Sequence, residues 1–580
     1  MNYINDFFAV REAMNAAFRQ NDLEKIKTDF VSWMYQQCIS YSKMNDEERE
    51  LTQSVPALDS MLKMKFFWPE NFAAEMKYKG MIAVVTHELS RTGAPLVLLD
   101  AVRLMKRAGY FVLLFSPEDG VMRDDFLQAG LPVMIGEYIR WLDKASENPE
   151  CCRFGEIFEA MISGTDLLFC NTVVTYPVIK KFIGCDLPIF WWIHEGKMVL
   201  DQVKENLPRS LSKQIHVFFV SEYSQKAFSN SGFCYENSNI MPYGIDDICQ
   251  AEIQTDHEKI KFLTVGTISE RKGQDVLIQA IQELDEETGE RCQFTFVGKE
   301  LDSPVYEQLC RAAQTNTSVE YKNEMDHEAL LEMMKSADCM ICPSRDDAMP
   351  VVATEGFALE KTVICSDHTG TADYIENGQN GFVFQNENVM ELKEQIRYVS
   401  RLSKEEREQI GKHARSIFEC HFTREIFEEA FLENLEKLTD EKEYDFAYTA
   451  GMASDVTLYQ QQRLVQLNDM YMQLKTDMRK QGDEAYRDGM YLHGVIKEKE
   501  QKILDYETEI KDLKTEAVVF RKEAEILRKS KESLEIQMQS LKNREEELEK
   551  RIHDIYNSKS WKITEPLRKA GKIWGEKSEP

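Results

Sequence analysis

The sequence lacks any apolar run close to the roughly 20 residues that a membrane-spanning helix needs. Its 13 cysteines are odd in number and irregularly spaced, so they suggest no disulfide framework and predict reduced thiols in a cytoplasmic protein. Basic residues are outnumbered by acidic ones, 71 to 100, and the resulting net charge of −29 argues against a general nucleic-acid binder, because phosphate repels such a surface. The first residues carry Asp6, Arg11 and Glu12 and do not resemble a signal peptide. Any anion site in this chain must therefore be local.

Apolar residues, by contrast, are plentiful. Of the 580 residues, 43% are hydrophobic and 29% charged, which is typical of globular proteins and enough for several domains. Residues 1–77 have amphipathic helical spacing and show no chemistry. We interpret them as a helical N-terminal extension that packs on the rest of the chain or binds a partner.

From residue 78 onward, short apolar runs rich in β-branched residues alternate with helical segments. The alternation runs through residues 78–247 and begins again in residues 258–437, of which residues 404–437 are typical of helices that close the second lobe. This pattern predicts the α/β class, with two doubly wound, Rossmann-like lobes on parallel sheets. Ligands of such sheets bind at the carboxyl ends of strands near topological switch points, so two facing lobes predict a cleft between them.

The C-terminal part is organised differently. Residues 440–495 are expected to form a helical linker, and residues 496–556 carry an unbroken heptad pattern from Ile503 to Ile555. The heptads predict a long coiled-coil helix and a homodimer. Residues 557–580 form a basic tail with interleaved aromatic residues, which suits an anionic membrane surface. Packing of this tail on its own coiled coil or on a partner is the alternative.

Two loops could bind an anion. Gly93 follows the first strand of the first lobe, where a glycine lets backbone N–H groups approach a ligand at the start of a helix. In the second lobe Gly266 ends the first strand, and Arg271 and Lys272 stand just before Gly273 and another helix. Their charge and the helix dipole would converge on one anion, for which a diphosphate is suitable. The alternatives are a tight strand-to-helix turn at Gly93 and a solvated loop with two surface cations.

Carboxylates follow a later strand of the second lobe. Asp347 lies in the loop and Glu355 in the helix behind it, placed to accept hydrogen bonds from sugar and ribose hydroxyls. Backbone N–H groups near residues 350–352 are free for phosphate. A capped helix with an ordinary ion pair is the alternative.

His194 and Glu195 end a strand of the first lobe and could face the cleft, although a lone histidine there is more often structural.

Several motifs occur in one order over residues 80–437, and together they resemble the family-four retaining glycosyltransferases, which have the GT-B fold. The segments that carry the likeness are Gly93–Pro95, Trp192–Glu195, Val220–Glu222, Pro242–Asp246, Val265–Gly266, Arg271–Gly273, Pro343–Arg345, Asp347–Glu355 and Asn380–Phe382. The chain departs from the family at Thr267, where Arg is frequent, at Asp347, where Glu is usual, and at Tyr243, where Asn is frequent.

The resemblance implies a role for each matching residue. It makes His194, Lys272 and Asp347 the catalytic group: His194 contacts the transferred sugar, Lys272 with Arg271 neutralises the departing diphosphate, and Asp347 holds sugar hydroxyls. Glu355 would hold the ribose. The expected substrate-binding residues are Gly93, Glu195, Gly266, Arg271, Lys272, Arg345, Asp347, Met349, Pro350, Val351, Glu355, Gly370 and Thr371, of which Gly370 and Thr371 would line the phosphate side.

The implied function is transfer of a sugar from a nucleotide-diphosphate sugar, with retention of the anomeric configuration and with no metal or other cofactor. The tail at residues 560–568 resembles those of large polysaccharide-synthesis glycosyltransferases. The tail therefore suggests that the acceptor is a cell-surface polysaccharide or is lipid-linked. It also suggests that the protein is cytoplasmic and peripheral on the inner face of the membrane. Two alternatives stay open: a GT-B sugar-nucleotide epimerase, and a non-catalytic coiled-coil scaffold that senses nucleotide sugars. The departures from the family pattern at Thr267 and Asp347 favour the scaffold.

Overall fold

The computed structural model describes residues 20–54, 64–72, 78–249, 258–301 and 303–439, with Met14, Ala17, Phe18 and Lys550 in addition. Apart from Lys550, the expected linker, coiled coil and basic tail at residues 440–580 lie outside the described residues. The lobes described below belong to the first of two compact units, residues 1–466.

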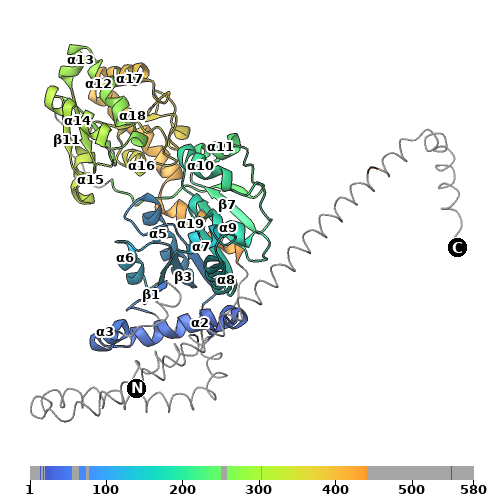
Figure 1. The fold of residues 1–580 in the computed structure, drawn as a ribbon. Coiled ribbons are helices and arrows are strands. Elements are labelled where there is room, and N and C mark those ends of the chain that lie inside the picture. The colour runs from blue at the N-terminus through green and yellow to red at the C-terminus, as the bar shows by residue number, and fades with distance from the viewer. Residues whose placement is uncertain are drawn as a thin grey trace, which may run out of the picture. The chain divides into compact units, whose positions relative to one another are not determined.

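The first lobe is built on an eight-stranded sheet with the order β1-β4-β3-β2-β5-β6-β7-β8. Strands β1, β3 and β7 of this sheet are labelled in Figure 1. All neighbouring strands run parallel except β1, which pairs antiparallel with β4. The strands are β1 (Met64–Phe67), β2 (Gly80–Val85), β3 (Tyr110–Ser116), β4 (Val133–Gly136), β5 (Leu167–Asn171), β6 (Ile189–Ile193), β7 (Ile215–Phe219) and β8 (Ser238–Ile240).

The second lobe is built on a six-stranded, all-parallel sheet with the order β11-β10-β9-β12-β13-β14. Its strands are β9 (Ile260–Val265), β10 (Cys292–Val297), β11 (Val319–Lys322), β12 (Cys339–Cys342), β13 (Thr362–Ser366) and β14 (Phe382–Phe384). The expectation of two doubly wound α/β lobes is confirmed.

Helices cover both faces of each sheet, as the continuous apolar strands require. On the first lobe these are α5 (Gly93–Arg107), α6 (Arg123–Gln128), α7 (Tyr138–Asp143), α8 (Pro149–Ser163), α9 (Tyr176–Phe182), α10 (Lys197–Val203) and α11 (Glu222–Asn230). The second lobe has α12 (Gln274–Gln282), α13 (Glu286–Arg291), α14 (Ser303–Thr315), α15 (His327–Ser336), α16 (Val351–Ala358), α17 (Val389–Arg401) and α18 (Lys404–His421). The last helix described is α19 (Arg424–Leu438).

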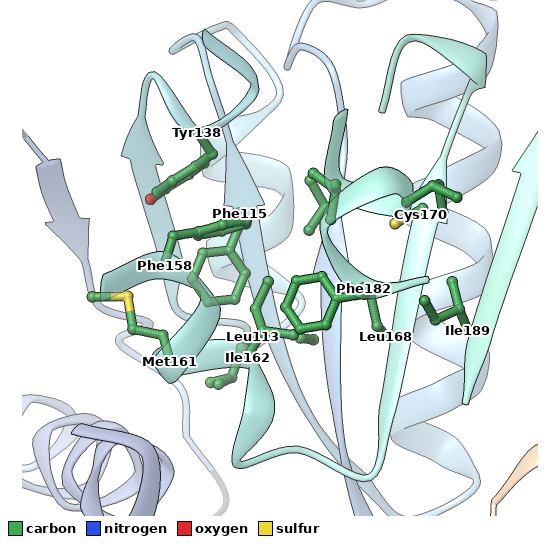
Figure 2. Close-up of a cluster of buried hydrophobic side chains, with 14 of the residues drawn as sticks. Leu113, Phe115, Tyr138, Phe158, Met161, Ile162, Leu168, Cys170, Phe182 and Ile189 are labelled. Atoms are coloured by element: carbon green, nitrogen blue, oxygen red, sulfur yellow. The ribbon is translucent and has the colours of Figure 1, made fainter. Parts of the chain in front are cut away.

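One face of the first sheet is buried under helices α7, α8 and α9. Figure 2 shows Phe115 of β3 beside Tyr138 and Phe158, whose rings stack with centroids 4.5 Å apart. Phe158 and Phe115 are fully buried. A core of this kind holds the sheet rigid, so the loops at its carboxyl edge start from fixed positions.

Residues 1–77 are not wholly helical, which corrects the expectation. Helices α2 (Leu23–Ser42) and α3 (Asp46–Ser54) are present, but residues 64–67 form strand β1 at the edge of the first sheet. Helix α2 packs on α8, and the Trp33 ring meets Phe66 of β1 at 5.8 Å. This segment therefore belongs to the core of the first lobe. A four-residue edge strand carries too little alternation to be recognised in the sequence.

The last helix also differs from the expectation, because α19 packs on the first lobe rather than closing the second. The Phe431 ring lies 5.8 Å from Phe190 and 6.2 Å from Trp192, both on β6. Phe427, Phe431 and Leu435 form one buried helix face. The stripe is evident in the sequence, but an apolar stripe does not specify which lobe it covers.

No helix among the described residues combines the length and the apolar character needed to cross a bilayer.

Candidate functional site

The site lies where both sheets have their topological switch points. In the first sheet β2 lies between β3 and β5, and in the second β9 lies between β10 and β12. Loops at the carboxyl ends of these strands, together with the residues that follow β6, enclose a cavity of about 420 Å³ between the lobes. Ligands of open α/β sheets bind at such points, where the loops on either side diverge and leave a crevice.

Ten of the fourteen expected site residues line this one cavity. From the first lobe these are Gly93, His194 and Glu195, and from the second Gly266, Arg271, Lys272, Asp347, Met349, Pro350 and Val351. Residues more than 250 positions apart in the chain therefore meet around one space.

The two cations are positioned by a tight turn after β9. Arg271 and Lys272 end a single 3-10 turn, and Gly273 follows with φ at 68°. A Cβ on Gly273 would lie 2.0 Å from the carbonyl oxygen of Pro343, so both the left-handed conformation and the close approach require glycine. Among the described residues that line the cavity, Arg271 and Lys272 are the only arginine or lysine. Thr267, where the family frequently has Arg, is not part of the lining.

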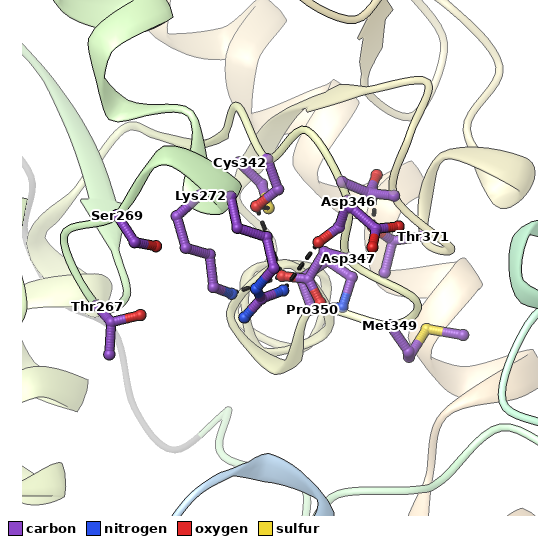
Figure 3. A network of polar contacts seen from close by, with 12 residues as sticks. Thr267, Ser269, Lys272, Cys342, Asp346, Asp347, Met349, Pro350 and Thr371 are labelled. Carbon is purple, nitrogen blue, oxygen red and sulfur yellow. Dashed lines mark hydrogen bonds and ion pairs between the residues drawn. The ribbon is translucent and has the colours of Figure 1, made fainter. Parts of the chain in front are cut away.

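Lys272 reaches across to the loop that carries Asp347. Its Nζ atom lies 2.5 Å from Oδ2 of Asp347, and both side chains are largely buried (Figure 3). Burial opposes ionisation of Asp347, but the charges of Lys272 and Arg271 outweigh it and lower the pKa of this carboxyl. Asp347 therefore stays ionised at neutral pH, which keeps a carboxylate at the cavity wall beside the Lys272 side chain.

His194 supplies an uncharged imidazole to the cavity. Burial, with a further contribution from His87, lowers its pKa to about 3, so it is neutral at physiological pH. Its ring lies 4.5 Å from that of Trp192, and its Nε2 atom has no hydrogen-bond partner among the described residues. A buried polar atom without a partner is rare in folded proteins and is often found at functional sites.

Glu195 holds the backbone beside His194. Its Oε2 atom accepts hydrogen bonds from the backbone N–H groups of His194 at 3.0 Å and Val173 at 2.9 Å. Burial raises the pKa of Glu195 to about 7, although the backbone donors act in the opposite direction. Glu195 lines the cavity, but its carboxylate is occupied with orienting the histidine loop.

The raised pKa of Glu195 predicts a pH dependence of stability. The unfolded chain releases this proton near its ordinary value of 4.5, whereas the folded chain keeps it until about pH 7. The stabilising contribution of Glu195 is therefore present below pH 4.5 and lost as the pH rises through 7. Relative to Glu195→Gln, the free energy of unfolding of the unmodified protein should fall by roughly 1–3 kcal/mol across this window.

Urea unfolding of both proteins between pH 4.5 and 8 measures this difference. His194 titrates in both proteins, so its own contribution largely cancels. Parallel stability curves across the whole window would contradict the buried, protonated carboxyl.

Helix α16 begins at the cavity without a side-chain cap. Pro350 is its N-cap residue, and no side chain accepts from the first helical N–H groups. Such N–H groups have no intrahelical partner and attract anions. The hydroxyl of Tyr243 donates to the carbonyl oxygen of Met349, which fixes the approach to the helix. Tyr243, which departs from the family pattern, therefore has a structural role here.

Arg345 does not point into the cavity, contrary to the expectation. Its guanidinium forms a bidentate pair with Asp275, with both distances 2.7 Å, and its Nε atom lies 2.6 Å from Glu387. Arg345 thus ties the loop after β12 to helix α12 on the outer side. In the sequence it could not be distinguished from a ligand-binding cation, because its acidic partners are 70 and 42 residues away.

Gly370 and Thr371 lie behind Asp347 rather than on the cavity lining. The N–H group of Gly370 donates to the carbonyl oxygen of Asp347 at 2.9 Å. Thr371 is fully buried, and its hydroxyl lies 3.5 Å from Sγ of Cys365 and 3.4 Å from Oγ1 of Thr369. These two residues support the loop that presents Asp347.

Glu355 belongs to α16 and is buried, but it does not line the cavity. Its Oε1 atom lies 2.9 Å from Nε2 of His327, the first residue of α15. The hydrogen bond to Glu355 raises the pKa of His327 above its ordinary value. His327 was not expected at the site, because nothing in its local sequence links it to a carboxylate 28 residues later.

Asp346 is the other residue that the sequence analysis missed. It lies next to Asp347 and is only 3% exposed, yet it accepts hydrogen bonds from residues of the first lobe. In the sequence Asp347 is recognisable as a candidate because it forms a carboxylate pair with Glu355 in the following helix. Asp346 belongs to no such pair.

Within the described ranges, no group of three or more His, Cys, Asp or Glu side chains could hold a metal ion.

Comparison with known proteins identifies the two lobes. Residues 79–232 match a model described as glycosyl-transferase family 4, and residues 247–417 match one described as glycosyl transferases group 1. Each lobe is thus similar to a glycosyltransferase domain. The first match lies within the first lobe, and the second runs from residue 247, ahead of β9, to residue 417 in α18. The resemblance of the motifs to glycosyltransferases is confirmed at this level.

Curated relatives match parts of these glycosyltransferase domains. The alpha-D-kanosaminyltransferase of Streptomyces kanamyceticus is 30% identical over 121 residues, which is 21% of this chain and 31% of the relative. The amylovoran biosynthesis glycosyltransferase AmsK of Erwinia amylovora is 23% identical over 215 residues, 35% of this chain and 50% of the relative. The matches span between 31% and 50% of the length of the curated relatives.

The arrangement of the two domains is that of known GT-B structures. Anabaena HepE, solved in complex with UDP and glucose, superposes with a TM-score of 0.50. The match covers 62% of this chain and all of that chain at 17% sequence identity. At this identity the likeness shows the GT-B fold and leaves the chemistry to the residues of the cavity.

Proposed function

We propose that the protein is a retaining glycosyltransferase that transfers a sugar from a nucleotide-diphosphate sugar to a glycan or lipid-linked acceptor. The observation that carries the proposal is the convergence of Arg271, Lys272, Asp347 and His194 on one cavity between the lobes. The cavity combines positive charge, a carboxylate acceptor, a neutral imidazole and the start of a helix. These are groups suited to a diphosphate and to a sugar.

The diphosphate would bind against the second lobe. Arg271 and Lys272 provide two cations, and the uncapped start of α16 provides backbone N–H groups. In the transition state the bond between the anomeric carbon and phosphate breaks and negative charge grows on the leaving diphosphate. Fixed positive groups at that point stabilise the charge, which is often the largest single contribution to catalysis. In this proposal the two cations take the place of a metal ion.

The sugar would lie between Asp347 and His194. Asp347 accepts hydrogen bonds from sugar hydroxyls, and the neutral His194 meets the sugar near its anomeric centre. The acceptor enters from the first lobe, past Gly93 at the start of α5. Its hydroxyl oxygen bonds to the anomeric carbon on the face that the diphosphate leaves, and its proton passes to the departing phosphate oxygen. This scheme requires no nucleophile from the protein and retains the anomeric configuration.

Glu355 would bind the ribose hydroxyls, as the family resemblance implies. His327 lies beside it, so ribose would form hydrogen bonds with Glu355 next to this imidazole. The similar fold of HepE, which was solved with UDP and glucose, supports a nucleotide sugar as donor. The similarity to AmsK, named for amylovoran biosynthesis, supports a growing polysaccharide as the acceptor of the sugar.

Thermal unfolding in the presence of UDP-, GDP- and dTDP-sugars tests the donor site. A ligand at about 100 times its Kd adds roughly 3 kcal/mol to native stability, which raises the Tm of a protein of this size by several degrees. We expect sugars of one nucleotide to give this shift and Arg271→Ala to reduce it. The absence of a shift with every nucleotide sugar at millimolar concentration would contradict the proposal.

Incubation with the stabilising donor alone separates transfer from epimerisation. A transferase is expected to leave the configuration of the donor sugar intact, whereas an epimerase would produce a second sugar nucleotide. A scaffold without activity would bind the donor and neither transfer nor hydrolyse its sugar.

A further inference from the structure

Asp346 makes a buried contact between the two lobes at the edge of the cavity. It follows β12 in the second lobe, and its carboxylate accepts from the backbone N–H groups of Lys197 at 2.9 Å and Met198 at 2.8 Å. Both belong to the first turn of α10 in the first lobe. The Tyr223 hydroxyl of α11 donates to the same carboxylate at 2.6 Å. Three donors of one lobe thus converge on a single carboxylate of the other.

The fit around this carboxylate is close. Gly196 is the N-cap residue of α10, and a Cβ there would lie 1.9 Å from Oδ1 of Asp346. Its backbone has φ at −98° and ψ at −156°, which any residue adopts, so glycine is required by the space and not by conformation. Only the absence of a side chain at residue 196 allows Asp346 to reach the helix start.

Asp346 is also connected to the groups proposed to act on the donor. Its own carbonyl oxygen accepts from Nη1 of Arg271 at 2.8 Å, and the next residue is Asp347, the partner of Lys272. On the other side, Lys197 is three residues from His194. One residue therefore joins the cations and the carboxylate of the second lobe to the histidine loop of the first.

We propose that Asp346 is a positioning residue for sugar transfer, which fastens the start of α10 and Tyr223 to the second lobe and so sets His194 opposite Lys272 and Asp347. The inference rests on the proposed function for its catalytic consequence, but the contact itself is independent of it. Donor binding depends mainly on the second lobe, whereas the reaction needs both lobes in register. Loss of the contact should therefore lower kcat much more than it weakens donor binding.

A second contact between the lobes offers a matched control. Lys226 of α11 pairs with Asp373 at 3.0 Å, and these side chains are 57% and 28% exposed. Exposed pairs of this kind contribute little to stability. Asp373→Asn removes the charge of an interlobe aspartate, as Asp346→Asn does, but at the solvent-exposed surface.

The first measurement is backbone hydrogen exchange of the full-length protein without substrate. In Asp346→Asn and Asp346→Ala, the amides of Lys197 and Met198 should exchange about tenfold faster or more, because their acceptor is weakened or lost. Tyr223→Phe should give a smaller effect in the same direction, and Asp373→Asn none. Unchanged exchange at these two amides in both Asp346 variants would overturn the proposal.

The second measurement is the split between kcat and the donor Kd. We expect Asp346→Ala to lower kcat by about a hundredfold, the cost of a misplacement near 1 Å, with donor Kd changed by no more than about threefold. Gly196→Ala alone should lower kcat by a similar factor, because its Cβ would collide with the Asp346 carboxylate. Added to Asp346→Ala, the same substitution should lower kcat much less, because the smaller side chain at residue 346 leaves space for that Cβ. An effect on donor Kd as large as that on kcat, or additive losses in the double variant, would contradict a positioning role.

The two measurements keep the two proposals separate. If the unmodified protein transfers no sugar, the proposed function fails, and hydrogen exchange still decides whether Asp346 holds the lobes together. If the protein is active and Asp346→Ala keeps both normal turnover and normal exchange, the positioning role alone is wrong. Near-identical melting temperatures of Asp346→Asn and Asp373→Asn show that a difference in turnover does not arise from unfolding.

Discussion

Replacing Lys272 with alanine is expected to lower kcat by about 10²–10³-fold, the usual loss when one fixed donor is removed from a developing negative charge. Lys272 and Arg271 are the two cations on the cavity lining. With Lys272 absent, charge on the leaving diphosphate would rest on Arg271 and the start of α16. Steady-state kinetics with the donor identified by thermal unfolding measures the loss.

Two further variants separate this loss from structural damage. Lys272→Ala alone leaves the buried Asp347 without its ion-pair partner at 2.5 Å, which is unfavourable for stability. Adding Asp347→Asn removes that charge, so the double variant should recover stability without recovering turnover. Lys412→Ala, at an exposed position of α18, should behave as the unmodified protein. Normal turnover in Lys272→Ala would count against the whole catalytic scheme.

The largest expected loss of stability is at Phe431. Its side chain is fully buried where α19 covers the first lobe, and its ring contacts those of Phe169, Phe190 and Trp192. Truncation of such a side chain costs about 3–5 kcal/mol, from lost burial and from the cavity left behind. Phe431→Ala should therefore lower the free energy of unfolding by that amount in urea. The fold requires α19 to join the lobes, and a change below about 1 kcal/mol would be inconsistent with this packing.

Tyr398→Ala is the matched control, because this aromatic residue is 54% exposed on α17. Its loss should change the free energy of unfolding by about 0.5 kcal/mol or less. The comparison isolates burial from the removal of an aromatic ring.

Much of the fold follows from local pattern. The strand β2 and the helix α5 that begins at Gly93 are evident as an apolar run, a loop and a helical stripe, and each is short-range information. The same holds for β9 with the turn at Arg271 and Lys272. Because parallel strands present their carboxyl ends at one edge, such local patterns also predict that the loops meet.

What the sequence did not reveal depends on partners far along the chain. Arg345 turns outward because Asp275 and Glu387 are there, and Asp346 turns toward the other lobe because α10 begins there. In each case the charged residue is visible in the sequence. The direction in which its side chain points is set by contacts with residues 42 to 149 positions away. Glu355 and His327 form a pair for the same reason. The sequence of a loop shows which functional groups are present, but it does not show whether each side chain points into the cavity or away from it.

The neutral state of His194 has a consequence for the proposed reaction. An imidazole with a pKa of about 3 carries no charge at pH 7, so it does not compete with Arg271 and Lys272 for the diphosphate. Nor does it repel the positive charge that grows on the sugar as its bond to phosphate breaks. The division is clear: cations face the leaving group from the second lobe, and a neutral ring faces the sugar from the first.

The most direct test of the central claim is the configuration of the sugar that the protein releases from its donor in water. Proton NMR can follow the first free sugar before its anomers interconvert, and this needs no knowledge of the acceptor. The proposed retaining mechanism predicts that the released sugar initially has the anomeric configuration that it had in the nucleotide sugar. Release of the opposite anomer, or no turnover of any nucleotide sugar that stabilises the protein, would contradict it.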